Sequence, residues 1–328
     1  MGDITVLVLA NPTEPQLAML EQLPPETNIA VGERTESFAR SARDADVIFN
    51  WSGSGELLRE VFLLSPRVRW VHTRSAGLDG LLFPELVESA APLTNGTGVF
   101  GESLGEFALA GILFFAKDLR RMVRNQSAGR WEPFSVAEIA GQTVAIIGYG
   151  DIGRAVASRA RAMGMRVVSV KRHAPPIGST DGFAERIYTP DRICEVISLA
   201  DYVVVAAPLT AETRGLIGEP QFAAMKPTAV VINLGRGPVI DEGAMVHALS
   251  GQRIRGAVLD VFDTEPLPDG HPFYRLENVL LSPHTADHTA DWLERAMRLF
   301  LDNYARFAKG QPLLNLVDKK LGYRSATA

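Results

Sequence analysis

Three short segments in the second half of the chain carry side chains whose types suit acid–base chemistry. They are Asn233-Leu-Gly-Arg236, Leu259-Asp260 with Glu265 five residues further on, and Leu281-Ser-Pro-His284. Each follows a short apolar run that predicts a β-strand, and open α/β sheets bind their ligands at the carboxyl ends of strands. An arginine can grip a carboxylate and polarise a neighbouring carbonyl, and a histidine can give a proton to the carbonyl oxygen. A carboxylate beside the imidazole orients it and favours its protonated form. Arg236, Glu265 and His284 together therefore predict a site that reduces a 2-oxo acid.

A glycine-rich segment upstream predicts the cofactor that such a reduction needs. The run Thr143–Ile147 is followed by Gly148-x-Gly150-x-x-Gly153 and then by a helix expected over Arg154–Ala162. Glycines at this spacing allow a tight turn, a close approach of the backbone to a pyrophosphate, and close packing of helix on strand. Because strand, turn, helix and next strand follow in the right order, we expect a dinucleotide here. The predicted loop contacts are Gly148, Tyr149, Gly150, Asp151, Ile152 and Gly153.

The end of the next strand bears on which nicotinamide cofactor binds. Where an NAD-preferring site usually has an aspartate or glutamate for the ribose 2′-hydroxyl, this chain has Lys171 and Arg172. These two cations would pair with the 2′-phosphate of NADP. The alternative is that they are solvated surface side chains. The prediction is that NADP(H) is preferred and that NAD(H) is possible.

The apolar runs that carry these segments alternate with helical stretches along the whole chain. Predicted strands lie at Ile4–Leu9, Val47–Phe49, Val68–His72, Thr143–Ile147, Arg166–Val170, Tyr202–Ala206, Ala229–Asn233, Gly256–Val261 and Val279–Leu281. Apolar strands joined by helical crossovers predict parallel sheets covered on both faces. We therefore expect an α/β protein with a doubly wound Rossmann domain for the cofactor and a smaller flavodoxin-like α/β domain for the substrate.

The boundaries of these domains are expected near two places in the chain. Glycines cluster at residues 96–101, just before a long helix predicted over Glu102 to about Arg124. Near the end, apolar side chains recur at helical spacing from Trp292 to Phe307, with no strand after them to cover. The simplest packing returns this last helix to the N-terminal domain. The prediction is a discontinuous substrate domain, residues 1–101 and 288–328, and a dinucleotide-binding domain, residues 102–287.

Composition and charge exclude several classes of protein. The 328 residues carry a net charge of −5, which argues against nucleic acid or an anionic membrane as the main partner. The longest apolar run, Phe107–Ala116, is too short for a transmembrane helix. The N-terminus lacks the basic region of a signal peptide, and the single cysteine, Cys194, fits a reducing compartment and a buried position. We expect a cytoplasmic protein with no membrane segment.

In combination, these motifs closely resemble those of the D-isomer-specific 2-hydroxyacid dehydrogenases. The resemblance extends over nearly the whole chain, from the Thr73–Gly77 loop to Asn315-Leu-Val. It implies NAD(P)H-dependent reduction of a small 2-oxo acid, such as glyoxylate or hydroxypyruvate, to the D-2-hydroxy acid. It implies that Arg236 binds the substrate, that Glu265 is the partner of the histidine, and that His284 is the general acid/base. A homodimer built around the helix expected at residues 102–124 is also implied.

The resemblance assigns further contacts. Backbone N–H groups of the Ser75-Ala76-Gly77 loop would bind the substrate carboxylate. Asp260 would hydrogen-bond the nicotinamide carboxamide, the Ala207-Pro208 turn would lie beside the cofactor ribose, and Leu234 would also contact the cofactor. The chain departs from the family pattern at Asp287, where the family usually has a small residue.

Other interpretations stay open. His284 and His288 are four residues apart, but the segment lacks the glutamate of a zinc-binding HExxH motif and a clear third ligand, so no metal is expected. Individually, Arg236, Glu265 and His284 could be structural ion pairs. Trp51 and Trp292 could line a substrate site, although tryptophans are more often core residues. Alternative functions are a short phosphoglycerate dehydrogenase and an NAD(H)-sensing regulatory protein without turnover.

Overall fold

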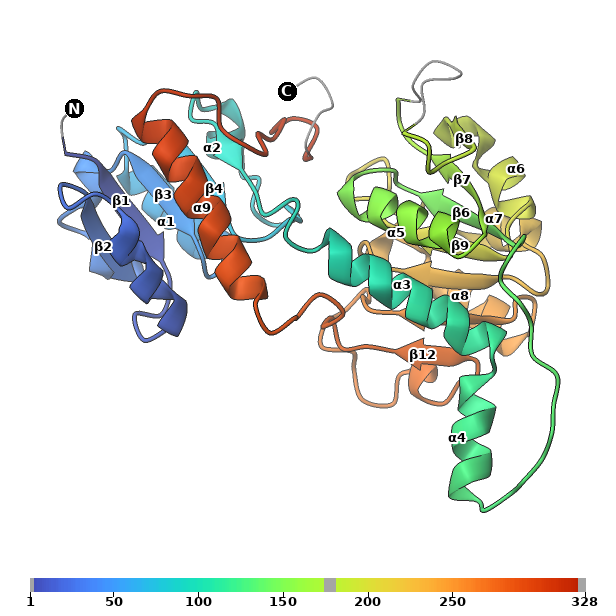
Figure 1. The fold of residues 1–328 in the computed structure, drawn as a ribbon. Coiled ribbons are helices and arrows are strands. Elements are labelled where there is room, and N and C mark those ends of the chain that lie inside the picture. Colours follow the sequence, from blue (N-terminus) through green and yellow to red (C-terminus); the bar gives the residue numbers. More distant parts are fainter. Residues whose placement is uncertain (1–2, 174–180, 324–328) are drawn as a thin grey trace. The chain divides into compact units, whose positions relative to one another are not determined.

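The chain divides into two compact units and passes from one to the other twice (Figure 1). The computed structural model describes residues 3–173 and 181–323. One unit comprises residues 1–100 and 290–328, and the other comprises residues 101–289. The predicted boundaries were 101/102 and 287/288. Each unit is built on its own sheet.

A five-stranded parallel sheet forms the centre of the smaller unit. Its strands are β1 (Thr5–Leu9), β2 (Asn28–Gly32), β3 (Val47–Asn50), β4 (Trp70–Thr73) and β5 (Leu93–Thr94), in the order β2-β1-β3-β4-β5. This is the strand order of flavodoxin-like folds. The helices are α1 (Gly55–Leu64), α2 (Pro84–Glu88) and α9 (Trp292–Ala308), with 3₁₀ turns at Pro15–Gln22, Thr35–Phe38 and Ala42–Asp44.

Helix α9 explains why this unit is discontinuous in sequence. Its Phe300 is fully buried and stacks on Phe49 of β3, with ring centroids 3.9 Å apart and an interplanar angle of 7°. Trp70 of β4 stacks on the same ring at 5.5 Å. Aromatic pairs of this kind add about 0.5–1.5 kcal/mol each to the free energy of burial. The C-terminal helix therefore completes the core of a sheet that is made by the first hundred residues.

The larger unit contains a seven-stranded parallel sheet in the order β12-β11-β10-β9-β6-β7-β8 (Figure 1). Its strands are β6 (Thr143–Ile147), β7 (Arg166–Val170), β8 (Arg186–Tyr188), β9 (Tyr202–Val205), β10 (Val230–Asn233), β11 (Gly256–Leu259) and β12 (Val279–Leu281). The chain runs outward from β6 in one direction and then returns to continue from β9 in the other. The gap between β6 and β9 is therefore the topological switch point at which doubly wound sheets bind dinucleotides. The predicted α/β fold class is confirmed.

Helices cover both faces of the larger sheet. The helices of this unit are α3 (Gly101–Ala116), α4 (Leu119–Ser127), α5 (Asp151–Ala162), α6 (Ile193–Ser198), α7 (Glu219–Ala224) and α8 (Glu242–Ser250), with 3₁₀ turns at Pro190–Arg192, Gly237–Val239 and Pro272–Tyr274. Of these, α4 follows α3 and extends away from the sheet (Figure 1). Within the described ranges, no helix is long and apolar enough to cross a membrane.

The long helix expected from Glu102 to Arg124 is wrong in one respect, because it is two helices. Asp118 has a left-handed backbone (φ +49°), and its carboxylate accepts a hydrogen bond from the N–H of Arg121. An aspartate in this position satisfies the first turn of a new helix, α4, and ends α3. The aspartate was the available signal, because the apolar pattern runs across the break.

Candidate active site

The glycine loop after β6 has the geometry of a phosphate cradle. Gly148 has φ +100° and donates its N–H to the carbonyl of Val170. A Cβ atom at Gly153 would lie 2.2 Å from the Gly148 carbonyl oxygen, so only glycine lets α5 begin this close to the turn. At Gly150, in contrast, an added Cβ meets nothing within 4 Å. The loop is thus tight at both ends and open in the middle, which fits the approach of a pyrophosphate.

Helix α5 begins at Asp151, three residues earlier than predicted, so its first turn lies within the glycine motif. The N–H groups at the start of a helix and the positive end of the helix dipole favour an anion. Tyr149, inside the loop, is buried and donates its hydroxyl to Asp181. Burial on its own would raise the pKa of the Asp181 carboxyl. Hydrogen bonds from Phe183 N–H and Tyr149 and the charge of Arg154 overcome this and lower it. The ionised Asp181 carboxylate therefore holds the glycine loop in place through its hydrogen bond from Tyr149.

The end of β7 carries the two cations expected there. The backbone N–H of Lys171 donates to Tyr188 of β8, and its side chain is partly exposed. The guanidinium of Arg172 forms an ion pair with Glu212, in the segment after β9. Glu212 was not predicted from the sequence as part of this site. A phosphate bound at this strand end would meet one arginine that already has a carboxylate partner.

The loop after β10 presents Arg236. The side chain of Asn233 accepts a hydrogen bond from the N–H of Gly235 and donates to the carbonyl of Arg236, which fixes the loop. Arg236 in turn donates from Nη1 to the Gly235 carbonyl at 2.8 Å. Gly235 lies against the backbone of Ala207, since an added Cβ would be 2.6 Å from its carbonyl oxygen. The Ala207-Pro208 turn and the buried Leu234 therefore lie beside the arginine loop, at the switch point.

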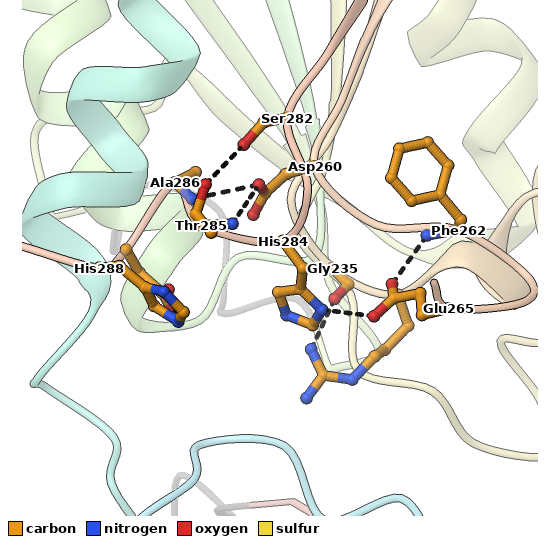
Figure 2. A network of polar contacts seen from close by, with 11 residues as sticks. Gly235, Asp260, Phe262, Glu265, Ser282, His284, Thr285, Ala286 and His288 are labelled. Carbon is orange, nitrogen blue, oxygen red and sulfur yellow. Dashed lines mark hydrogen bonds and ion pairs between the residues drawn. The ribbon is translucent and has the colours of Figure 1, made fainter. Parts of the chain in front are cut away.

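Glu265 and His284 form a hydrogen-bonded pair (Figure 2). His284 Nδ1 and Glu265 Oε2 are 2.7 Å apart, and both side chains are partly exposed. The other carboxylate oxygen, Oε1, accepts the backbone N–H of Phe262 at 2.9 Å. His284 itself has a left-handed backbone, with φ +54°. With Nδ1 engaged by the carboxylate, the second ring nitrogen is left to carry a proton to or from a ligand.

The turn that carries His284 is held from two sides. Asp260, at the end of β11, is buried, and its Oδ1 accepts the N–H groups of Thr285 at 3.0 Å and Ala286 at 3.1 Å (Figure 2). On the other side, the hydroxyl of Ser103 on α3 donates to the Ala286 carbonyl at 2.6 Å. Asp260 was predicted to hydrogen-bond the nicotinamide carboxamide; what the structure shows is that its carboxylate fixes the histidine turn. Ser103 was missed, because 183 residues separate it from its partner.

Asp287 and His288 continue this turn. Burial raises the pKa of the Asp287 carboxyl; His288 and His284 act in the opposite direction, and Asp260 adds to the rise. His288 Nε2 lies 3.7 Å from Asp287 Oδ1. Among the residues that the structure describes, no three His, Cys, Asp or Glu side chains come together as metal ligands would.

The Ser75-Ala76-Gly77 loop belongs to the smaller unit, at the carboxyl end of β4. Its carbonyl groups are held by residues that follow β5: Gly96 N–H donates to Ser75 at 3.0 Å, and the Asn95 amide donates to Ala76 at 2.7 Å. None of the hydrogen bonds found in residues 3–173 and 181–323 uses the N–H groups of these three loop residues. The loop therefore offers N–H donors in the way expected of a carboxylate-binding loop.

Fold and site together define a nicotinamide-dependent dehydrogenase, and comparison with known proteins gives the family. Residues 109–286 match the family model of the D-isomer specific 2-hydroxyacid dehydrogenase, NAD binding domain. A glyoxylate reductase of Korarchaeum cryptofilum is 33% identical over 274 residues, 80% of each chain. A D-3-phosphoglycerate dehydrogenase of Methanocaldococcus jannaschii is 29% identical over 96% of this chain and 59% of its own length.

Solved structures agree with the sequence matches. An NADPH-dependent glyoxylate/hydroxypyruvate reductase of Sinorhizobium meliloti, in complex with NADP and sulfate, superposes with a TM-score of 0.85. It is 26% identical and covers 98% of this chain and 100% of its own. The chain belongs to the D-isomer specific 2-hydroxyacid dehydrogenases and is an NAD(P)-dependent enzyme of that family. The predicted family is confirmed.

Proposed function

We propose that the protein reduces a small 2-oxo acid, such as glyoxylate or hydroxypyruvate, to the D-2-hydroxy acid. The observation that carries the proposal is the His284–Glu265 pair, which lies with Arg236 at the carboxyl end of the Rossmann sheet. The glyoxylate reductases among the relatives support the choice of substrate. The cofactor, when bound, supplies the hydride; the rest of the chemistry belongs to the side chains.

Each of these side chains has one task. Arg236 binds the substrate carboxylate and polarises the carbonyl, with the N–H groups of Ser75-Ala76-Gly77 as further donors to the carboxylate. His284 gives its proton to the carbonyl oxygen as that oxygen becomes negative. Glu265 fixes the orientation of the imidazole through Nδ1, which lies 2.7 Å from its Oε2. In the reverse direction, His284 takes the proton back.

We further propose that NADPH is the preferred cofactor, held by residues 148–153, Lys171 and Arg172, with Ala207-Pro208, Leu234 and Asp260 as further contacts. Support comes from the absence of a carboxylate within the β7 end itself and from the NADP found in the Sinorhizobium meliloti structure. The Arg172–Glu212 ion pair opposes this binding, because the 2′-phosphate must compete with Glu212 for the guanidinium.

The test is oxidation of NADPH and of NADH, followed at 340 nm, with glyoxylate, hydroxypyruvate, pyruvate and phenylpyruvate. The expected result is turnover of at least one acid, faster with NADPH than with NADH. Chiral analysis of the product of hydroxypyruvate, pyruvate or phenylpyruvate should give the D isomer, whereas the glycolate formed from glyoxylate is achiral. Cofactor binding without turnover of any acid would contradict the proposed function and favour a sensing role. Equal rates of turnover with NADPH and with NADH would contradict only the assignment of NADPH as the preferred cofactor.

We also propose a cytoplasmic homodimer. Exposed apolar side chains gather on α4 and the segment after it: Met122, Val123 and Trp131, the last of which is 98% exposed. A second copy that covers α4 would remove this apolar surface from water. Sedimentation at micromolar concentration should give twice the mass of one chain; a monomer would contradict the proposal. Cell fractionation should find the protein, with a reduced Cys194, in the cytoplasmic fraction.

A further inference from the structure

An arginine next to the carboxylate-binding loop has no part in the chemistry assigned so far. Arg74 directly follows β4 and precedes Ser75. Its guanidinium carbon lies 4.9 Å from the ring centroid of Trp51 and 5.2 Å from that of Trp292. Trp51 follows the neighbouring strand β3 and is fully buried, and Trp292 begins α9. Arg74 is thus placed on aromatic faces at the carboxyl edge of the smaller sheet, the edge at which open α/β sheets bind ligands.

The guanidinium is short of hydrogen-bond partners. In the described part of the chain, no carboxylate or carbonyl oxygen forms a hydrogen bond or ion pair with its N–H groups. The nearby acid, Glu14, instead accepts the indole N–H of Trp51. Burial lowers the pKa of Arg74, and the charge of Glu14 only partly opposes this. A partly buried cation without a hydrogen-bonded anion is destabilising, and its flat face on an indole leaves the N–H edges free for a planar acceptor.

The surroundings place this cation close to the substrate loop. Besides being adjacent in sequence to Ser75, Arg74 donates its own N–H to Asn50 at the end of β3. A Cβ atom at Gly53, two residues after Trp51, would lie 3.6 Å from the Ser75 hydroxyl. The loops that follow β3 and β4 are therefore neighbours, and a ligand on the N–H groups of residues 75–77 lies within reach of both.

We propose that Arg74 binds a second acidic group of the substrate, and that the enzyme prefers 2-oxo acids with a carboxylate or phosphate at the end far from the oxo acid group. This rests on the proposed function, in which Arg236 takes the first carboxylate. A monoanionic acid such as pyruvate leaves Arg74 without an anion. An acid with two anionic groups neutralises both arginines.

The test uses two pairs of substrates that differ by one acidic group: pyruvate with oxaloacetate, and hydroxypyruvate with 3-phosphohydroxypyruvate. Arg74→Gln should lower kcat/KM for the doubly charged acids about 10–100-fold, since charge-assisted hydrogen bonds have this strength. For pyruvate and hydroxypyruvate the change should be less than about threefold. The two pairs show whether a carboxylate or a phosphate is the natural second group.

Three further variants make the test sharper. Arg74→Lys should restore part of the preference, because the charge remains. Glu14→Gln should act in the opposite direction and lower KM for the doubly charged acids, because it removes a negative charge but keeps an acceptor for Trp51. Arg69→Gln is the matched control, since Arg69 lies on Phe307 in the same kind of contact but precedes β4, at the other end of the strand. It should leave all four substrates unchanged.

Every outcome decides the proposal. Equal losses for both members of each pair would overturn it and make Arg74 a structural clamp. Turnover of only the singly charged acids by the unmodified enzyme would overturn it while the proposed function stands. If no acid is reduced, the proposed function fails, and titration calorimetry with D-malate and D-lactate decides instead: binding of D-malate that is lost in Arg74→Gln supports the assignment. If Arg74→Gln does not fold, unchanged KM values in both Arg74→Lys and Glu14→Gln overturn it.

Discussion

The His284 imidazole is fixed through one ring nitrogen and left free at the other. Glu265 holds Nδ1 at 2.7 Å, and Phe262 N–H holds Glu265 in turn. The carboxylate thus keeps its position without the histidine, whereas the histidine depends on the carboxylate for its orientation. Loss of either residue should consequently impair proton transfer, but to different degrees.

His284→Ala should lower kcat by about 10²–10⁴-fold, the usual contribution of a general acid. Glu265→Gln should have a smaller effect, because the amide oxygen can still accept a hydrogen bond from Nδ1, although a neutral acceptor binds it less strongly than a carboxylate does. Steady-state kinetics measure kcat of both variants. Titration with NADPH measures its Kd, which should stay within about threefold of the value for the unmodified protein. His247→Ala, an exposed histidine on α8, is the control. Full activity in His284→Ala would exclude His284 from the mechanism.

The cations at the end of β7 give a prediction about cofactor choice. Replacement of Lys171 and Arg172 by Ala should weaken NADPH binding by about 10-fold or more and leave NADH nearly unchanged, because only NADPH carries the 2′-phosphate. Glu212→Gln should tighten NADPH, because it removes the competing partner of Arg172. Fluorescence titration of the reduced cofactors measures both effects. Equal losses for the two cofactors would contradict the assignment.

At the scale of elements, α3 and α5 are packed unusually closely. A Cβ atom at Gly105 of α3 would lie 3.1 Å from the backbone of Ala155 in α5. Arg159 of α5 forms an ion pair with Glu102 of α3. Since α5 begins inside the glycine loop and α3 carries Ser103, this one helix contact supports both the phosphate cradle and the histidine turn.

Gly105→Val should therefore act at a distance. The added methyl groups would press on the backbone of α5 and lower the free energy of unfolding by about 1–3 kcal/mol, although valine is the better helix former. The Kd of NADPH should rise, because α5 must move. Thermal unfolding and cofactor titration measure the two effects. Ala110→Val, at an exposed position of α3, should change neither by much; an equal effect there would contradict the packing argument.

The elements that the sequence predicted and those that it missed differ in burial and length. The nine predicted strands have continuous apolar runs, and all are present. The missed strands are β2, β5 and β8: β2 and β8 lie at sheet edges with exposed residues, and β5 has only two residues. Partly exposed strands such as β2 and β8, and a strand of two residues such as β5, give a weaker apolar pattern than a fully buried strand does. The candidate site residues were predicted from their type and place, but the long-range contacts of Ser103, Asn95 and Arg74 were not, because such pairs leave no pattern in one sequence.

At the scale of the whole molecule, a buried histidine links stability to pH. His72 of β4 is fully buried, accepts or donates one hydrogen bond with Thr94 at 2.7 Å, and has no partner at Nε2 in the described part of the chain. Burial lowers its pKa from 6.5 to about 3. The unfolded chain therefore binds one proton more than the folded chain between pH 6.5 and 3, so stability falls as the pH falls through this range.

Urea unfolding at pH 7 and pH 5 should show a loss from this group of about 2 kcal/mol, on a slope of about 1.4 kcal/mol per pH unit below pH 6.5. His72→Gln should be less stable at pH 7 but should lose less on acidification, because it does not titrate. His247→Gln, at an exposed site, should keep the full slope. A slope that is the same in His72→Gln as in the unmodified protein would contradict the assignment.

The return of α9 to the first sheet also orders the events of synthesis. Residues 1–100 leave the ribosome before residues 101–289, yet Phe49 and Trp70 have no Phe300 to stack on until α9 has also been synthesised. Residues 101–289 form one uninterrupted stretch with their own sheet. Residues 101–289 can therefore fold before the smaller unit does. Residues 1–100 keep part of their apolar surface uncovered until α9 has been synthesised and packs on their sheet.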